Sequence, residues 1–186
     1  MSVKNDFAMP IIVLACICFF VSGALAFVNG LTQPIIERSA AMRAWETARE
    51  IMPHAEDFEL LEIESFRSAS GLPETIIAVL ETTNDVGYIF MIATNGYGGE
   101  IRLVCGIDPD GKIIRTAVMA HSETIGFGTP IFEEPYSGQF WGRDKDGIEG
   151  IAGISGATIT SNAFKNGIRD AFTAFEIVAA KGRGAR

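Results

Sequence analysis

Hydrophobic and polar positions divide the chain into one long apolar run near its start and a longer stretch in which the two kinds alternate. No charged residue occurs between Asp6 and Glu37, and residues 11–28 read IIVLACICFFVSGALAFV. A helix of about 20 such residues crosses the hydrocarbon core of a bilayer. The pattern therefore predicts a transmembrane helix over residues 11–31, with residues 1–31 forming an N-terminal tail and anchor.

A cleaved secretory signal peptide is the alternative interpretation of this segment. Lys4 gives it a weakly basic start, and residues 24–26 (Ala-Leu-Ala) resemble a cleavage site. The apolar run continues past these three residues, which favours a retained anchor. Its orientation stays open, because Arg38, Arg43 and Arg49 follow the run and the positive-inside rule does not favour an outside domain.

The segment after the anchor has the features of a helix over residues 32–53. Thr32 fits the N-cap, Pro34 suits the first turn, and Pro53 ends the helix. Apolar positions recur within it at helical spacing, and Trp45 is most simply a contact of the core.

Alternating apolar and polar residues follow, as is typical of strands. Strands are expected over residues 58–65, 74–83, 86–96, 99–107 and 112–123. Asp-Pro-Asp-Gly at 108–111 predicts a hairpin between the last two. A glycine-rich loop occupies 125–150, and helical spacing returns over 159–180. Consecutive strands bracketed by helices indicate an α+β fold, an antiparallel sheet flanked by helices, in one domain over residues 32–186.

Charge and composition exclude several classes of function. With 15 Lys and Arg against 23 Asp and Glu, the 186-residue chain has a net charge of −8. It would be repelled by phosphate groups, so no nucleic-acid partner is expected. The two histidines are far apart and no metal-binding motif occurs, so no protein-built metal site is expected. Three unclustered cysteines give no disulfide framework and are expected to be packing residues.

The sequence GISGATITSNAF at residues 153–164 places small residues and hydroxyls at the start of the last helix. Free N–H groups and the helix dipole make such a start an anion site, and Gly153, Gly156 and Ala157 would let a ligand approach the backbone. The alternative is that Ser155 or Thr158 only caps the helix. A P-loop is excluded, because no GxxxxGK[ST] sequence is present.

The stretch SGATIT at residues 155–160 resembles the flavin-attachment motif of FMN-binding-domain proteins. This family includes the G subunit of Rnf-type electron-transport complexes and the C subunit of sodium-translocating NADH:quinone reductase. Three further stretches resemble the family in the same order: GLTQPIIE at 30–37, NGYGGEIRLVCGIDPDGKI at 95–113 and HSETIGFGTP at 121–130. The length is closer to the short G subunit, with the longer C subunit as the alternative.

The resemblance implies a covalent flavin. In the family, FMN is joined through its phosphate, by a phosphoester bond, to the threonine of the S/T-G-A-T motif, which corresponds to Thr158. A separate flavin transferase moves FMN from FAD, so Thr158 would be a passive acceptor and the helix start would hold the phosphodiester. The redox chemistry would then belong to the cofactor.

The resemblance also implies a place for the chain in the cell. It would be an electron-relay subunit of a membrane-bound complex that transfers electrons from reduced ferredoxin to NAD and moves Na+ or H+. Other membrane subunits, the flavin transferase and membrane lipid are the implied partners. Because the transferase of the family acts outside, residues 37–186 would lie on the outer face of the cytoplasmic membrane. No complete active site is expected on this chain alone.

Two loops supply the candidate flavin contacts. In the loop at residues 123–128, Thr124 can hydrogen-bond the flavin ring and Phe127 can pack against it. Glu123 could equally cap the loop or form an ion pair. His121 could equally be an ordinary exposed residue, and Trp141 is more simply a core residue than a cofactor contact. Besides Thr158, the candidates are Ser155, Gly156, Ala157 and Thr160 in the first loop, and His121, Glu123, Thr124, Gly126, Phe127 and Gly128 in the second.

Three positions depart from the family pattern. Ala152 stands where the family often has Asp, three residues before the serine of the motif, which bears on recognition by the transferase. Ile125 replaces a proline and Phe127 a leucine, while Gly126 and Gly128 are retained and should preserve the loop geometry.

Two rival functions belong to other classes. A membrane-anchored, non-redox module would grip a free phosphate-bearing ligand at residues 153–160. A structural subunit that has lost its flavin would only brace a membrane complex, although the retained motif at 155–158 argues against this.

Overall fold

The computed structural model describes residues 3–184, with the side chains of residues 3–8, 31, 33–42, 65, 68–70 and 182–184 left out of the description. The chain divides into two compact units, Met1–Arg43 and Ala44–Arg186. The orientation argument from Lys4 and Arg38, and most of the resemblance at residues 30–37, fall on side chains outside the described ones.

The first unit is helical and exposes apolar side chains on every side. Helix α1 (Val3–Ile51) contains the segment Met9–Gly30, which among the described residues is the one helix long and apolar enough to cross a membrane. Phe19 and Phe20 are 77% and 74% exposed. A helix that is apolar all round is suited to lipid, in agreement with the expected anchor.

The prediction of a separate helix that begins at Thr32 is wrong. Helix α1 is continuous through this position, and the Thr32 hydroxyl donates to the carbonyl of Val28, one turn earlier, instead of capping a new helix. This is the bond that threonine makes inside helices. The helix ends at Ile51, close to Pro53 as expected.

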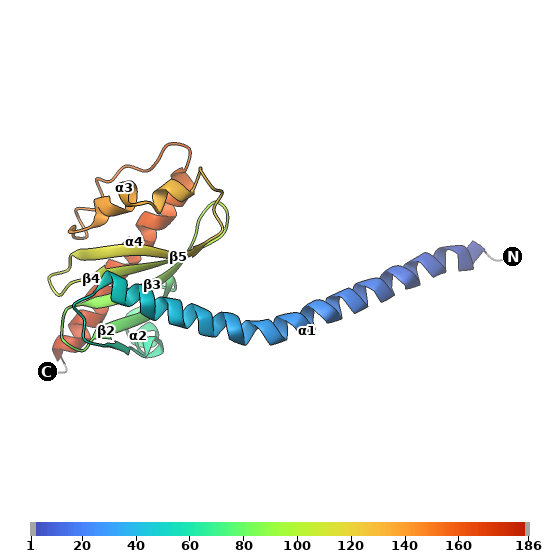
Figure 1. The fold of residues 1–186 in the computed structure, drawn as a ribbon, viewed down its shortest axis with the longest axis horizontal. Coiled ribbons are helices and arrows are strands. Elements are labelled where there is room, and N and C mark those ends of the chain that lie inside the picture. The colour runs from blue at the N-terminus through green and yellow to red at the C-terminus, as the bar shows by residue number, and fades with distance from the viewer. Residues whose placement is uncertain (1–2, 185–186) are drawn as a thin grey trace. The chain divides into compact units, whose positions relative to one another are not determined.

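The second unit is built on a five-stranded antiparallel sheet in the order β1-β2-β3-β4-β5. Figure 1 labels β2 to β5 of this sheet. The predicted hairpin is confirmed at residues 108–111, where Gly111 has φ +79° and the Asp108 carboxylate accepts the Lys112 N–H at 2.8 Å. The expected α+β class is therefore confirmed. The strands are β1 (Phe58–Leu60), β2 (Ile76–Thr82), β3 (Tyr88–Asn95), β4 (Glu100–Ile107) and β5 (Ile113–His121).

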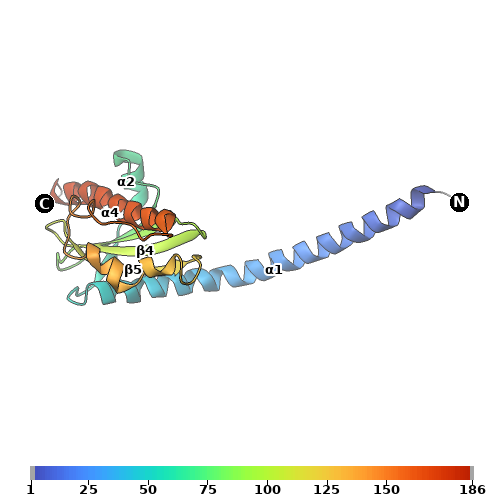
Figure 2. The ribbon, with the colours of Figure 1, turned by 90° about the horizontal axis from the view of Figure 1, so that it is seen from above.

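Helices cover both faces of this sheet (Figure 2). Alternate residues of β3 point to opposite sides: Phe90 and Ile92 pack in the core beneath α4 (Thr158–Gly184), whereas Ile89 and Met91 pack in a second core with the end of α1. Helix α4 lies close to the strands because Gly167 has no side chain; a Cβ there would be 3.3 Å from Ile92 Cγ2. These contacts hold α4 against the sheet.

Two irregular regions differ from the expectations. The strand expected over 58–65 ends at Leu60, and residues Ile63–Ser70 form helix α2, closed by Gly71 in the left-handed conformation (φ +68°). The loop after β5 contains three short helices, η1 (Thr129–Ile131), α3 (Glu134–Ser137) and η2 (Gly138–Phe140).

Both tryptophans pack against other residues of the second unit. Trp45 is 37% exposed and packs edge-to-face on Phe58. Trp141 packs against the main core and donates to the Thr116 hydroxyl at 3.4 Å, and it does not line the cavity described below. Trp141 therefore has the expected core role, whereas Trp45 lies at the exposed margin of the second core, where it covers Phe58.

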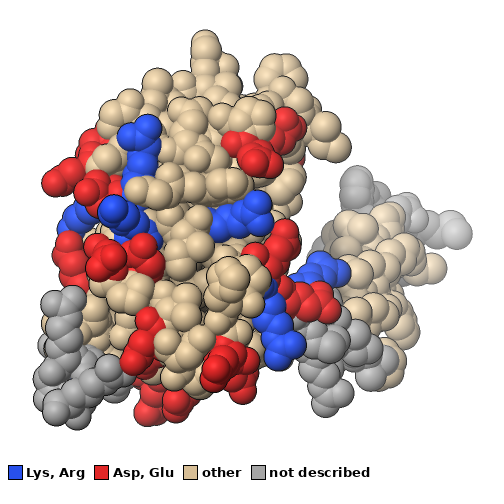
Figure 3. All heavy atoms as spheres, turned by 60° about the vertical axis from the view of Figure 1, so that its left-hand side comes forward, with Lys and Arg blue, Asp and Glu red and all other residues tan. Residues whose placement is uncertain are grey.

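The surface of the second unit mixes charges of both signs. On the face drawn in Figure 3, basic and acidic side chains are intermingled, and acidic side chains follow its lower edge. Exposed ion pairs such as Arg169–Glu149 and Lys145–Glu176, each 2.8 Å long, contribute at most about 1 kcal/mol apiece. The fold is therefore held by its two apolar cores.

Candidate functional site

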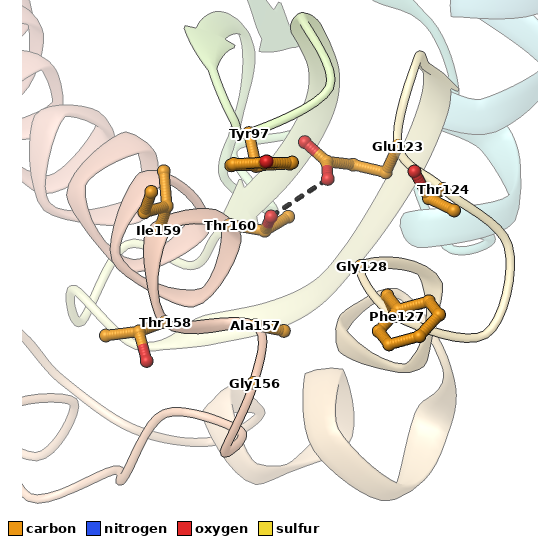
Figure 4. A pocket seen from close by; sticks show the side chains of 10 residues that line it. All are labelled: Tyr97, Glu123, Thr124, Phe127, Gly128, Gly156, Ala157, Thr158, Ile159 and Thr160. Atoms are coloured by element: carbon orange, nitrogen blue, oxygen red, sulfur yellow. Dashed lines mark hydrogen bonds between the residues drawn. The ribbon is translucent and has the colours of Figure 1, made fainter.

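A cavity of about 570 Å³ opens where α4 begins. This volume is in the range of sites for small molecules and cofactors. Three segments far apart in the sequence meet around it: the turn between β3 and β4, the loop after β5, and the start of α4 (Figure 4). The lining residues are Tyr97, Glu123, Thr124, Phe127, Gly128, Gly156, Ala157, Thr158, Ile159 and Thr160.

The loop before α4 is a tight turn that leaves its backbone bare. The Ala157 N–H donates to the Ile154 carbonyl at 3.0 Å, and Gly156 adopts φ +83°, which only glycine adopts readily. A Cβ on Gly156 would meet nothing within 4 Å. The turn is pinned by Ser161, whose buried hydroxyl accepts the Ile154 N–H at 3.0 Å. The bare peptide groups therefore border open space.

Two threonines in the first turn of α4 have opposite environments. Thr158 is exposed, and in the part of the chain that the structure describes its hydroxyl makes no hydrogen bond, nor does that of Ser155. Thr160 is 1% exposed and donates to Glu123 Oε2 at 2.9 Å. The alternative in which Ser155 or Thr158 caps the helix is therefore wrong, because Ser161 pins the turn instead.

Glu123 braces the cavity from inside. Its side chain is 7% exposed, and its two carboxylate oxygens accept the Gly98 N–H at 3.0 Å and the Thr160 hydroxyl at 2.9 Å. A buried carboxylate is stable only when it is bonded in this way. Of the alternatives open from the sequence, the structure shows hydrogen bonding across the loops, and no ion pair of Glu123 occurs among the described side chains.

Exposed apolar side chains form the outer wall of the cavity. Tyr97 is 76% exposed, Phe127 71% and Ile159 56%. Such side chains lose water contact favourably against a flat apolar ligand. Phe127 was expected from the sequence, whereas Tyr97 and Ile159 were missed. The signal for Tyr97 was its place in the glycine-rich stretch Gly96-Tyr97-Gly98-Gly99, which already resembled the family.

Eight of the eleven candidate residues meet around the cavity, and three do not line it. Ser155 is exposed just before the lining segment. Gly126 adopts φ +83° and donates its N–H to the Thr129 hydroxyl at 3.0 Å. His121 is exposed at the end of β5 and stacks on Phe132, with ring centroids 4.7 Å apart. A flavin contact of these three residues stays a prediction.

Other reactive groups of the folded unit are removed from the cavity. Burial raises the pKa of the Cys105 thiol, which keeps this cysteine protonated and unreactive. Burial also raises the pKa of the Tyr136 hydroxyl. The ring of Tyr136 packs on Phe140 and Phe164. No cluster of His, Cys, Asp or Glu that could hold a metal ion occurs among the described residues. The cavity is thus a place for a ligand held by hydroxyls, backbone and apolar walls.

The segment that lines this cavity matches a known protein family. Residues 96–173, which include all ten lining residues, match the family model of the FMN-binding domain. The G subunit of the Na+-translocating ferredoxin:NAD+ oxidoreductase complex of Acetobacterium woodii is 30% identical over 179 residues, covering 83% of this chain and 86% of the relative. This chain belongs to the family of G subunits of ion-translocating oxidoreductase complexes.

Other G subunits show the same extent of similarity. The G subunit of an ion-translocating oxidoreductase complex from Methanosarcina acetivorans is 30% identical over 92% of this chain and 95% of its own length. The G subunit of a proton-translocating ferredoxin:NAD+ oxidoreductase complex from Clostridium ljungdahlii is 27% identical over 85% of both chains. The similarity extends over most of the chain. Together with the apolar segment Met9–Gly30, it indicates a membrane protein.

Proposed function

We propose that this chain is an electron-transfer subunit of an Rnf-type membrane complex and carries FMN joined by a phosphoester bond to Thr158. The observation that carries the proposal is the Thr158 hydroxyl, exposed and without a hydrogen bond among the described residues, at the edge of the cavity. Its neighbour Thr160 is buried and bonded to Glu123, so it is a poor acceptor.

The residues present suit a flavin. The phosphodiester would lie at the start of α4, where free N–H groups and the helix dipole favour a negative charge. Tyr97, Phe127 and Ile159 would contact the ring, and Thr124 could hydrogen-bond its polar edge. Bound FMN supplies the redox chemistry, while the chain holds, orients and partly shields it.

Attachment requires a separate enzyme and FAD. A bond forms between Thr158 Oγ1 and the phosphorus of the FMN half of FAD, the pyrophosphate bond breaks, and AMP leaves while the hydroxyl proton is released. A threonine hydroxyl is a weak nucleophile that needs a base. None of the ten described residues that line the cavity is a histidine or lysine, and the carboxylate of Glu123 is already bonded to Gly98 and Thr160. The activating group would therefore come from the flavin transferase.

Charge argues against the rival module that grips a free phosphate-bearing ligand. A phosphate monoester carries a charge of about −1.5 to −2 at neutral pH. The described lining contains no Lys, Arg or His, and it contains the carboxylate of Glu123. A phosphodiester has only one negative charge, which the helix start can hold, so covalent attachment suits this cavity better.

The names of the relatives suggest the wider role. We infer that the chain relays electrons in a complex that couples electron transfer between ferredoxin and NAD to movement of Na+ or H+, since relatives are named for each ion. Residues 37–186 would lie outside the cytoplasmic membrane, and electrons would reach them through membrane-embedded subunits. The small residues Ser22 and Gly23 of the anchor are suited to close packing against such partners.

Acid precipitation distinguishes the proposed function from its rivals. The full chain, co-expressed with a flavin transferase and purified in detergent, should stay yellow in the acid-precipitated pellet. A free ligand would remain in the supernatant, and a structural subunit would be colourless throughout. Either result would contradict the covalent attachment of FMN.

Protease digestion of intact spheroplasts tests the orientation. An outside domain should be digested and leave a short anchored fragment that contains Met9–Gly30. Protection of the domain until lysis would place it in the cytoplasm. A full-length domain found free of the membrane would indicate a cleaved signal peptide.

A further inference from the structure

We propose that Glu123 is the positioning residue of this site: its carboxylate ties the turn that carries Tyr97 to the first turn of α4, which carries Thr158. The inference rests on the proposed function for the identity of the ligand. The bridge itself is made only of residues of this chain.

The two arms of the bridge reach across the fold. Glu123 Oε1 accepts the N–H of Gly98, next to Tyr97, and Glu123 Oε2 accepts the hydroxyl of Thr160, two residues after Thr158. In Figure 4 the carboxylate points toward the start of α4, and its bond to Thr160 is drawn dashed. One buried group thus sets the spacing between an aromatic wall and the attachment point.

Three glycines make room for the bridge. A Cβ on Gly96 would lie 2.1 Å from Glu123 Oε1, and one on Gly128 would lie 2.5 Å from Glu123 Oε2. A Cβ on Gly98 would lie 2.4 Å from the Ser122 carbonyl oxygen. None of the three has a φ in the left-handed region, so their backbone conformation does not require glycine. Glycine is required at these positions because the neighbouring segments approach residues 122–123 too closely for a Cβ.

Burial couples the two arms. A carboxylate removed from water depends on each of its hydrogen bonds, so loss of one arm leaves an oxygen unsatisfied and shifts the carboxylate. Residues that share one hydrogen-bond network have non-additive effects. A change at Thr160 should therefore be felt at Gly98, on another segment.

Amide hydrogen exchange in the full-length Thr158→Ala chain, which lacks the attachment point, tests the bridge without flavin. Glu123→Ala should speed exchange at Gly98 by at least about tenfold, the lower bound for loss of a hydrogen bond to a charged group. Thr160→Val should speed it at least about twofold, as expected for coupling within one network. Thr160→Ser keeps the hydroxyl and should have no effect.

Two controls make this result decisive. The Phe90 amide, in the middle of the sheet, exchanges through global unfolding, so its rate should follow the free energy of unfolding of each variant. Exchange at Gly98 that stays faster than at Phe90 in every variant reports local opening and not general loosening of the fold. In a Glu123→Ala background, Thr160→Val should add nothing at Gly98, because the bridge is already lost. Unchanged exchange at Gly98 in Thr160→Val, or the same acceleration with and without Glu123, would overturn the proposal.

The loaded chain gives a second readout. At equal content of acid-stable flavin, Tyr97→Leu and Thr160→Val should both raise the emission per flavin, because aromatic stacking quenches flavin emission, and Thr160→Ser should not. Equal emission in Thr160→Val and wild type would show that the bridge does not position the ring wall. A wild-type chain without acid-stable flavin would contradict the proposed function, and hydrogen exchange would still decide the bridge.

Discussion

The two sides of the first turn of α4 carry the same kind of side chain in opposite settings. Thr158 is exposed at the edge of the cavity with no hydrogen bond among the described residues, while Thr160 is 1% exposed and bonded to Glu123. One helix turn can present a reactive hydroxyl and a structural hydroxyl on different sides, because residues two apart point in different directions. One hydroxyl is available for reaction, and the other holds the scaffold in place.

The largest expected effect is the loss of flavin from one side of the turn only. In cells that contain the transferase, Thr158→Ala should abolish in-gel flavin fluorescence, because no acceptor oxygen remains. Thr160→Ala should keep most of it, because the acceptor is untouched. Fluorescence that persists in Thr158→Ala, or disappears only in Thr160→Ala, would reverse the roles of the two threonines.

Stability should show the opposite order. Thr160→Val leaves Glu123 short of a donor and should lower the free energy of unfolding by about 2 kcal/mol. Thr158→Val, at an exposed position, should change it by less than about 0.5 kcal/mol. Urea unfolding of the full chain in detergent can be followed by the fluorescence of Trp45 and Trp141, both in the folded unit. Equal costs at the two positions would contradict the division of roles.

Alanine variants of two glycines with the same backbone conformation distinguish the effect of backbone strain from the effect of lost ligand contact. Gly156 and Gly126 both have φ +83°, and a Cβ on either would meet nothing within 4 Å. Alanine should cost about 1 kcal/mol of stability at each. Of the two, Gly156 lines the cavity, so Gly156→Ala should lower the flavin content more than Gly126→Ala does. Equal flavin content in the two variants would remove Gly156 from the ligand contacts.

The smallest expected effect concerns recognition by the transferase. Ala152 is exposed and precedes the turn, so Ala152→Asp should leave the fold unchanged. If the transferase reads this position, the variant should carry more flavin per chain when the transferase is limiting. Flavin absorbance per protein measures the difference. Equal occupancy would show that the position is not read.

The sheet and the helix behind it could be predicted from local patterns. Alternation over 74–83, 86–96, 99–107 and 112–123 marked β2 to β5, and helical spacing marked α4. These signals are reliable because strands and helices bury alternating or periodic positions. The strand predicted over 58–65 was wrong in its second half, because Ile63 and Phe66 give a helical pattern too short to be distinguished from that of a strand.

The site was only partly within reach of the sequence. Thr158 and the second loop carry local motifs, whereas Tyr97 reaches the cavity through the pairing of β3 with β4. The bridge through Glu123 joins residues 25 and 37 positions away, a distance over which no periodicity or turn rule applies. The break expected at Thr32 failed because capping residues also occur inside helices, where their hydroxyls bond the previous turn.

The most direct test of the central claim is the mass of one tryptic peptide. Cleavage after Lys145 and Lys165 releases residues 146–165, which contain the whole attachment loop. From chains produced with the transferase, this peptide should be heavier by FMN minus water, and fragmentation should locate the added mass on Thr158. An unmodified peptide, or an adduct on Ser155 or Thr160, would contradict the account.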